Sequence, residues 1–391
     1  MRKRIWLAGA VVLVAFGLSC SDDTRSPITP TAPTYAKGGA KVKSISVSPS
    51  AATITVGQTL QLTATVSPAS ASTTIAWASS NNSVATISQT GVVSGVAAGS
   101  ASISASGGGA TGTSAITVVT PPPPGSVVMV GAGDIASCSS SGDEATANLL
   151  DGIDGTVFNL GDNVYDSGTA SEFANCYNPT WGRHKARTKP SPGNHEYGTA
   201  GAAGYFGYFG TAAGDPSKGY YSYNLGDWHV VVLNSNLSCA VVSCAPNSPQ
   251  EQWLRGDLAA NTKLCTLAYW HHPRFNSGAE HGNDLDVSPL WDALYQYNAD
   301  VILNGHEHIY ERFAPQNPSG VADNARGIRE FIVGTGGRSH YTFGTIQPNS
   351  EVRNSNTYGV LKLTLSASGY SWQFVPVAGA TFTDSGSGSC H

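Results

Sequence analysis

The stretch "TVFNLGDNVYDSG", residues 156–168, decides the fold of the larger part of this chain. It places a short apolar run before a Gly-Asp pair and a loop, and "SVVMVGAGDIAS" at 126–137 repeats this arrangement. Between them, "GDEATANLLDGI" at 142–153 has helical character. A strand, a helix and a second strand in this order predict a parallel core whose active residues lie at the carboxyl ends of its strands.

Side chains that can bind metals follow several predicted strands. Later strands are predicted in "HVVVLNS", "CTLAYWHHP", "ADVILNGHEH" and "REFIVGTGG", and helices at 248–260 and 288–298. A single Asp or His after a strand is often only a turn residue, but five motifs in a fixed order indicate a common cleft. Glycine precedes the ligand in "GD", "GD", "GN" and "GH", which lets the backbone turn tightly. The candidate residues are Asp134, Asp162, Tyr165, Asn194, His195 (the last two in "SPGNHEYG", 191–198), His271, His306 and His308.

The first third of the chain has a different pattern. From residue 44 to 119, apolar and polar residues alternate with period two between Pro and Gly breaks, which predicts a small all-β sandwich. Its stretches "VSPSAATITVGQTLQLTATV", "WASSNNSVATIS" and "GVVSGVAAGSASISA" resemble the bacterial Ig-like domain, group 2. It contains no His and no acidic residue, so we expect a spacer, or a weak binder of cell-surface polymers. "TPPPPG" at 120–125 is a stiff proline-rich linker.

The N-terminus indicates export. "MRKR" followed by "IWLAGAVVLVAFGL" is typical of a signal peptide, which we assign to residues 1–19. "GLSC" resembles a bacterial lipoprotein box and predicts a lipid on Cys20, which would be the only membrane contact; the alternative is ordinary cleavage and secretion. Residues 20–43 have few apolar side chains and predict a flexible tether. The protein is therefore expected in the cell envelope or outside the cell.

The number of cysteines predicts disulfide bonds, and the net charge argues against nucleic-acid binding. Without Cys20, six cysteines remain, and an even number in an oxidising compartment predicts disulfides with up to 15 pairings. The closest pair is Cys239 with Cys244, and Cys138 with Cys176 is the second candidate; the absence of a CxxC pair disfavours a thiolate metal site. A net charge of −5 and a pI of about 6.0 give no basic surface for nucleic acid.

The order of the metal-binding motifs resembles the calcineurin-like metallophosphoesterases over residues 126–391. A tyrosine three residues after the second Asp makes the chain similar to the purple acid phosphatase branch of that family. The resemblance implies an α/β domain of two packed β-sheets flanked by helices, which would follow the Ig-like sandwich. In eukaryotic relatives a fibronectin-like domain precedes the catalytic domain, so substrate contacts drawn from that domain are not carried over to this chain.

The resemblance also implies two metal sites. The first would be held by Asp134, Asp162, Tyr165 and His308, and the second by Asp162, Asn194, His271 and His306, with Asp162 bridging both. Phenolate is a hard anionic donor and favours Fe(III) in the first site, with Zn, Mn or Fe(II) in the second. His272, the neighbour of His271, is not expected to be a ligand.

The function implied is hydrolysis of small phosphomonoesters by a metal-activated water. His195 would lie just outside the metals and face the phosphate. His281, in "FNSGAEHGND", is a second candidate for protonating the leaving group by its loop position, although it could equally be a solvated loop histidine. The basic run from Arg183 to Lys189 is either a solvated helix face or a guide for anionic substrate. The alternatives are a phosphodiesterase or nucleotidase at the same site, and a catalytically inactive surface-binding protein.

Overall fold

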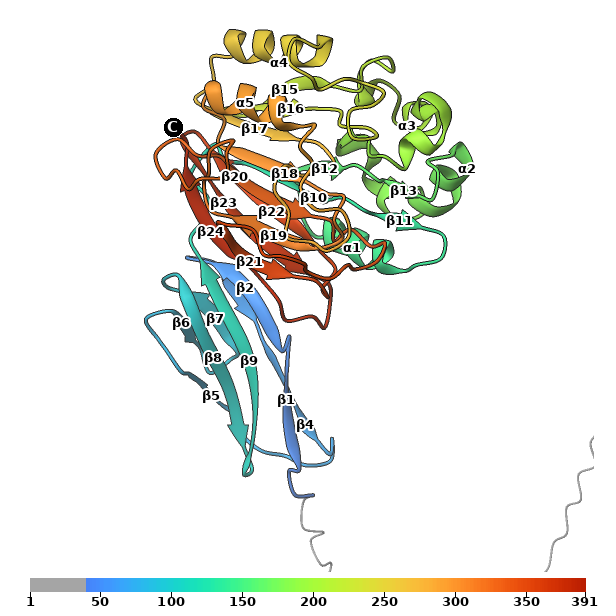
Figure 1. Ribbon diagram of the computed structural model, residues 1–391. Coiled ribbons are helices and arrows are strands. Elements are labelled where there is room, and N and C mark those ends of the chain that lie inside the picture. The colour runs from blue at the N-terminus through green and yellow to red at the C-terminus, as the bar shows by residue number, and fades with distance from the viewer. Residues whose placement is uncertain (1–39) are drawn as a thin grey trace, which may run out of the picture. The chain divides into compact units, whose positions relative to one another are not determined.

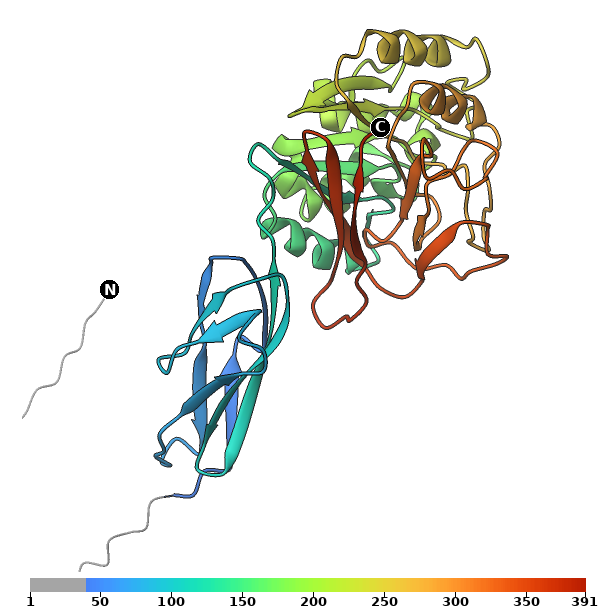
Figure 2. The same ribbon diagram turned by 90° about the vertical axis from the view of Figure 1, so that its left-hand side faces the viewer.

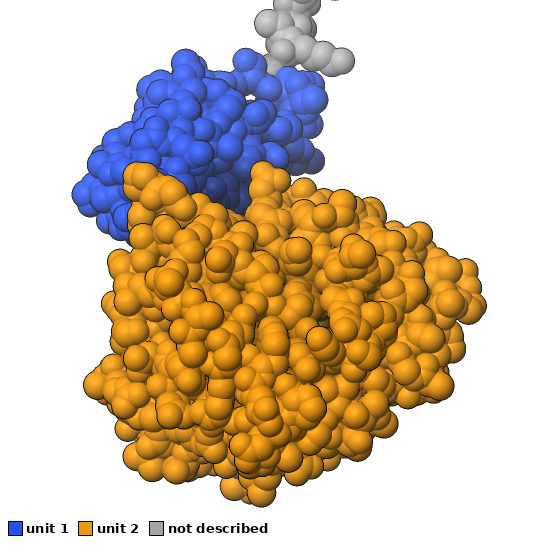
Figure 3. Space-filling model, turned by 90° about the horizontal axis from the view of Figure 1, so that it is seen from above, with its two compact units in different colours: residues 1–121 blue, residues 122–391 orange. Residues whose placement is uncertain are grey.

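The computed structural model describes residues 40–391, which form two compact units that divide between Pro121 and Pro122 (Figure 3). The expected signal peptide, the expected lipid site at Cys20 and most of the expected tether lie outside the described residues. At the end of that tether, Val42 packs against the core of the first unit, and the backbone N–H of Lys43 donates to the carbonyl of Ser67 at 2.8 Å. No helix in residues 40–391 is long and apolar enough to cross a membrane.

The first unit is the all-β sandwich that the alternating pattern predicts. Its sheets have the strand orders β1-β4, β2-β9-β8-β5 and β3-β7-β6. One face of each strand contributes to a core around Trp77 and Ile103, because side chains alternate between the two faces of a strand. The strands are β1 (Ser44–Ser48), β2 (Ala51–Thr55), β3 (Thr59–Gln61), β4 (Thr63–Ser67), β5 (Ala76–Ser79), β6 (Ala85–Ile87), β7 (Val92–Gly95), β8 (Gly99–Gly107) and β9 (Ala110–Val119).

The second unit contains two large mixed sheets (Figure 1), and its strand orders are β14-β12-β10-β22-β23-β24 and β15-β16-β17-β18-β20-β19-β21. Strands β11 and β13 form a small separate pair. The strands are β10 (Val127–Ala132), β11 (Ala136–Ser137), β12 (Thr156–Leu160), β13 (Val164–Tyr165), β14 (Thr188–Ser191), β15 (Tyr221–Leu225), β16 (Trp228–Val232), β17 (Cys265–Tyr269), β18 (Val301–Asn304), β19 (Tyr310–Phe313), β20 (Arg329–Val333), β21 (Ser350–Asn354), β22 (Gly359–Ser366), β23 (Gly369–Pro376) and β24 (Ser385–Ser389).

The expectation of a parallel core holds only in part. Strands β10, β12 and β14 are parallel, as are β16, β17, β18 and β20, but β22 pairs antiparallel with β10. Strands β22 and β10 come from distant parts of the sequence, where no local pattern specifies the partner, whereas β15–β16 and β22–β23 are antiparallel hairpins of consecutive strands. Two α-helices begin within a residue of the expected positions. The α-helices are α1 (Gly142–Asp151), α2 (Ala170–Glu172), α3 (Ala203–Phe209), α4 (Pro249–Ala260) and α5 (Ser288–Gln296), with short 3₁₀ or π turns between them.

The central strands β16, β17 and β18 of the seven-stranded sheet are buried on both faces, which explains their apolar composition. In β17, Leu267 and Tyr269 belong to the core shared with the six-stranded sheet, whereas Ala268 belongs to the core that includes residues of α4 and α5. Figures 1 and 2 show α4 and α5 on the same side of the seven-stranded sheet. The helices contribute Leu254 and Trp291 to that second core. The carboxyl ends of the parallel strands of both sheets are therefore held by rigid packing.

The second unit contains three disulfide bonds. Cys138–Cys176 and Cys239–Cys244 confirm the two predicted pairs. The third bond joins Cys265 at the start of β17 to Cys390 near the C-terminus, 125 residues away. It ties the last segment of the chain to the centre of the seven-stranded sheet.

Candidate metal centre

The predicted residues follow the carboxyl ends of strands from both sheets. Asp134 and Asp162 come two residues after β10 and β12, and Asn194 follows β14. His271 comes two residues after β17, and His306 comes two residues after β18. The oxygen donors thus come from the side of the six-stranded sheet, and the imidazoles from the seven-stranded sheet.

The backbone turns sharply at these positions. Asp134, Asp162 and His306 have positive φ values of 58°, 44° and 70°. Non-glycine residues adopt this conformation only at a cost of about 1–3 kcal/mol, and such residues gather at functional sites. Glycine is required beside them, because a Cβ on Gly193 would lie 2.2 Å from Asp162 Oδ1, and one on Gly161 would lie 2.5 Å from His271 Nδ1.

The Tyr165 hydroxyl is the centre of one group of donor atoms. It lies 2.9 Å from Asp134 Oδ1, 3.2 Å from Asp162 Oδ2 and 3.0 Å from His308 Nε2. The other ring nitrogen of His308, Nδ1, lies 2.8 Å from Ser339 Oγ, which orients the ring. The phenolic hydroxyl can donate to only one of the two carboxylates at a time, whereas a cation bound beside it could contact both carboxylates.

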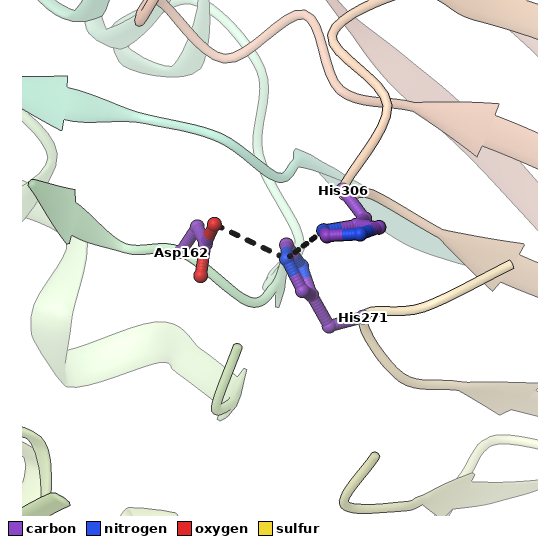
Figure 4. Close-up of side chains that lie close together, drawn as sticks. All are labelled: Asp162, His271 and His306. Carbon is purple, nitrogen blue, oxygen red and sulfur yellow. Dashed lines mark hydrogen bonds and ion pairs between the residues drawn. The ribbon is translucent and has the colours of Figure 1, made fainter. Parts of the chain in front are cut away.

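His271 Nε2 is the centre of a second group. It lies 3.2 Å from Asp162 Oδ2, 3.1 Å from Asn194 Oδ1 and 3.2 Å from His306 Nδ1. Figure 4 shows His271 between Asp162 and His306. The carbonyl of Leu160 lies 2.7 Å from His271 Nδ1 and fixes the ring. One ligand atom from each of Asp162, His271 and His306 falls within 4.8 Å of the others, close enough to hold one metal ion.

The electrostatics of the cluster favour a cation. Asp134 and Asp162 are buried, with 0% and 2% of their surface exposed. Burial alone would lower the pKa of His271, but the adjacent Asp162 carboxylate raises it to about 9. Burial would raise the pKa of Asp162, but His271 and His195 hold it below its usual value. Burial and the two carboxylates raise the pKa of Tyr165 well above its ordinary value.

His195 lies at the edge of the cluster, with its side chain one-third exposed. Its backbone N–H donates to Asp162 Oδ1 at 2.9 Å, and its Nδ1 lies 2.6 Å from the carbonyl of Asp166. The imidazole packs against Tyr165, with 4.4 Å between ring centroids, and Nε2 lies 3.9 Å from Asp162 Oδ2. A bonded Nδ1 leaves Nε2 as the nitrogen that can meet a ligand.

His281 is also brought to the cluster. Its ring centroid lies 4.0 Å from that of His306, and its Nδ1 lies 3.1 Å from the Glu307 carboxylate. His272 is adjacent, but its Nδ1 is engaged by Ser235 Oγ at 2.7 Å. The His281 ring therefore belongs to the rim of this site.

Sequence reasoning missed several supporting residues. Glu196, the last residue of "GNHE", is fully buried and accepts from the backbone N–H groups of Asn163 and Gly193 at 2.8 and 2.7 Å, so it joins the two ligand loops. Burial and the Asp162 charge raise the pKa of Glu196 to about 7. The guanidinium of Arg338 lies 5.0 Å over the Tyr165 ring. Arg338 follows β20 at the same edge of the sheet, which is the signal that could have found it.

The basic run before "GNHE" has structural contacts. Arg183 forms ion pairs with Glu144 at 2.8 Å and with Asp151 at 3.1 Å. Arg187 donates to the carbonyls of Leu150, Ile153 and Gly155 at the end of α1. These contacts favour the helix-face interpretation over a guide for substrate, but most of the run lies in a 3₁₀ segment (Trp181–Arg187), and His184 is buried rather than solvated.

The chain is similar to known proteins in two separate regions. Residues 41–118 match the bacterial Ig-like domain (group 2), and residues 130–310 match the calcineurin-like phosphoesterase family. Purple acid phosphatase 15 of Arabidopsis thaliana is 33% identical over 105 residues, which are 26% of this chain and 19% of that protein. Purple acid phosphatase 23 of the same plant is 30% identical over 151 residues, 34% and 32% of the two chains. The matches thus span only about a fifth to a third of these relatives.

A solved structure shows the same fold. Purple acid phosphatase PPD1 from yellow lupin (Lupinus luteus) seeds has a TM-score of 0.53 and 16% identity, with 88% of this chain and 68% of that chain covered. The chain therefore carries a bacterial Ig-like domain followed by a domain that belongs to the calcineurin-like phosphoesterase family.

Proposed function

We propose that the second unit is a dinuclear metal-dependent phosphatase that hydrolyses phosphomonoesters. The observation that carries the proposal is the convergence of donors from five strand ends on two adjacent centres. In each centre three potential ligand atoms lie within 3.2 Å of one central atom, Tyr165 Oη or His271 Nε2, and the Asp162 carboxylate already raises the pKa of His271. Carboxylate, phenolate, amide and imidazole donors fit divalent or trivalent ions.

Asp162 is the proposed bridge between the two metals. Its Oδ2 lies 3.2 Å from both Tyr165 Oη and His271 Nε2, the central atoms of the two groups. Fe(III) is proposed for the group with the phenolate, and Zn, Mn or Fe(II) for the group with the amide. The first set is Asp134, Asp162, Tyr165 and His308, and the second is Asp162, Asn194, His271 and His306.

When bound, two metals supply Lewis acidity that lowers the pKa of water and offsets charge on phosphate oxygens. The chain itself supplies orientation and protons. His195, held through Nδ1 by the Asp166 carbonyl, presents Nε2 toward the centre, where it can hydrogen-bond a phosphate oxygen. His281, on the other side beside His306, is proposed to protonate the leaving alkoxide.

Metal analysis combined with a phosphoester panel tests the proposal. We expect two metals per native chain and faster turnover of nitrophenyl phosphate than of bis-nitrophenyl phosphate. Preference for the diester would instead make the protein a phosphodiesterase. A chain that holds both metals but hydrolyses neither compound would refute the phosphatase assignment and leave a surface-binding role.

We further propose that the protein is exported and that residues 44–119 are dispensable for the chemistry. Three disulfides fit an oxidising compartment. All of the proposed ligands lie after residue 125, so residues 126–391 alone should retain turnover. Loss of most turnover in a folded, metal-loaded truncation would show instead that the Ig-like domain shapes the site. Contacts of that domain with cell-surface polymers remain a separate proposal.

A further inference from the structure

Glu307 lies between two of the proposed ligands in "NGHEH", and its carboxylate contacts the loop that carries His281. Its side chain is fully buried, and its carboxylate accepts four hydrogen bonds from one loop. The donors are the Asn276 side chain at 3.0 Å, the backbone N–H groups of Glu280 and His281 at 3.1 Å each, and His281 Nδ1 at 3.1 Å. A single carboxylate thus fixes both the backbone and the ring of His281.

The loop is fitted closely around this carboxylate. A Cβ on Gly278 would lie 2.1 Å from Glu307 Oε1, so the chain can pass here only with glycine. The His281 ring lies 4.0 Å from the ring of His306, whereas its side chain is 35% exposed. With Nδ1 bonded to the buried carboxylate, Nε2 is the ring nitrogen left to face a substrate.

We propose that Glu307 is a positioning residue that holds His281 Nε2 at the leaving-group side of the phosphoester site. The inference rests on the proposed function. In the reaction, the Nε2–H bond breaks as the proton moves to the leaving oxygen, which receives the electron pair of the broken P–O bond. Because the same segment carries His306 and His308, Glu307 fixes the position of this histidine relative to the metals.

A second buried glutamate provides a matched control. Glu311 is also fully buried, and it accepts from the backbone N–H of Ser277 at 2.9 Å, in the same loop. It also bonds to the hydroxyl of Ser350. Glu311 therefore anchors the loop, but within residues 40–391 it makes no hydrogen bond or ion pair with His281. Replacing it tests loop anchoring without removing the partner of the imidazole.

The experiment compares Glu307→Ala, Glu307→Gln, His281→Ala, the double variant Glu307→Ala/His281→Ala and Glu311→Gln in the full metal-loaded chain. An acid that is correctly positioned contributes about 10²–10⁴-fold. We expect Glu307→Ala to lower kcat for an alkyl phosphate by about 10–100-fold, a part of that effect. Turnover of nitrophenyl phosphate should fall much less, because its leaving group needs little protonation. Glu307→Gln keeps an acceptor oxygen and should restore part of the loss.

The double variant should be no slower than His281→Ala, and metal content should stay unchanged. Backbone amide exchange at residues 280–281 should accelerate in Glu307→Ala and not in Glu311→Gln. Three outcomes would overturn the inference and leave the phosphatase assignment intact. The losses of kcat could multiply in the double variant, they could be equal for both esters, or Glu311→Gln could show the same dependence on the ester as Glu307→Ala. A metal-loaded wild type that hydrolyses no ester would overturn the proposed function, and this inference with it.

Discussion

Tyr165→Phe gives the sharpest test of the proposed iron site, because it removes one oxygen and keeps the ring. The ring packs against His195 and His308, with centroids 4.4 and 5.9 Å apart, and these contacts survive the substitution. In the metal-free protein the hydroxyl can donate to only one carboxylate, and a hydrogen bond to a charged acceptor contributes about 1.5–3 kcal/mol. We expect the metal-free variant to lose roughly that much free energy of unfolding.

Metal loading should reveal a second difference. The raised pKa of Tyr165 means that its phenol is protonated in the metal-free protein at neutral pH, so binding through phenolate must release that proton. Wild type should therefore release about one proton more per chain than Tyr165→Phe when Fe(III) binds at pH 7. Charge transfer from phenolate to Fe(III) should also colour the oxidised wild type pink to purple, and the variant should lack this visible band.

Visible absorption and calorimetry in buffers of different ionisation enthalpy measure these two effects. Tyr341→Phe is the matched control, because its ring stacks on His308 at 4.0 Å but its hydroxyl has no hydrogen-bond partner recorded among residues 40–391. It should keep both the band and the proton count. A band that persists in Tyr165→Phe, equal proton release in both proteins, or an oxidised iron-loaded wild type without colour would refute the phenolate assignment.

Three further outcomes are expected. Asn194→Ala should reduce the second metal to well below one equivalent while the first stays bound, whereas Asp162→Ala should disturb both; two full metals in Asp162→Ala, measured by elemental analysis, would contradict the bridge. His195→Ala should lower turnover by roughly 10²–10⁴-fold at unchanged metal content, and loss of metal would instead make it a ligand. Replacing both cysteines of Cys265–Cys390 by serine should lower the free energy of unfolding by about 5 kcal/mol, because this bond closes a loop of 125 residues. The same change at Cys239–Cys244 should cost about 2 kcal/mol, because that loop spans only 5 residues. Urea unfolding measures the two losses, and the reverse order would show that loop entropy does not control them.

The sequence predicts the position of most candidate donors because they come just after buried strands. Asp162 comes two residues after the last residue of β12, and the same spacing holds for His271 after β17. The apolar composition of these strands identifies them in the sequence, and the carboxyl ends of parallel strands lie at the same edge of a sheet. Local pattern and global position therefore agree at these residues.

Residues that act through distant partners could not be predicted in the same way. Glu307 looks like a spacer between two histidines, and its partner His281 is 26 residues earlier in a loop without regular structure. The Cys265–Cys390 bond spans 125 residues, and no spacing rule selects it from the alternatives. The antiparallel pairing of β22 with β10 likewise depends on packing between segments more than 200 residues apart. This packing must outweigh the conformational entropy that is lost when so long a loop is closed.

The division of donors between the sheets connects fold and site. Three proposed oxygen donors follow strands of the six-stranded sheet, and the fourth lies in the small β11-β13 pair; they are Asp134, Asp162, Asn194 and Tyr165. The three proposed imidazole ligands follow strands of the seven-stranded sheet; they are His271, His306 and His308. In the proposed assignment, neither sheet alone presents a complete ligand set for either metal. The two buried carboxylates at this junction need positive partners, because an unpaired buried charge is unfavourable. His271 supplies one such partner without metal, and the proposed cations would supply more. On this proposal, metal binding and the packing of the two sheets should stabilise each other, since ions that bind only the folded chain shift the unfolding equilibrium by mass action.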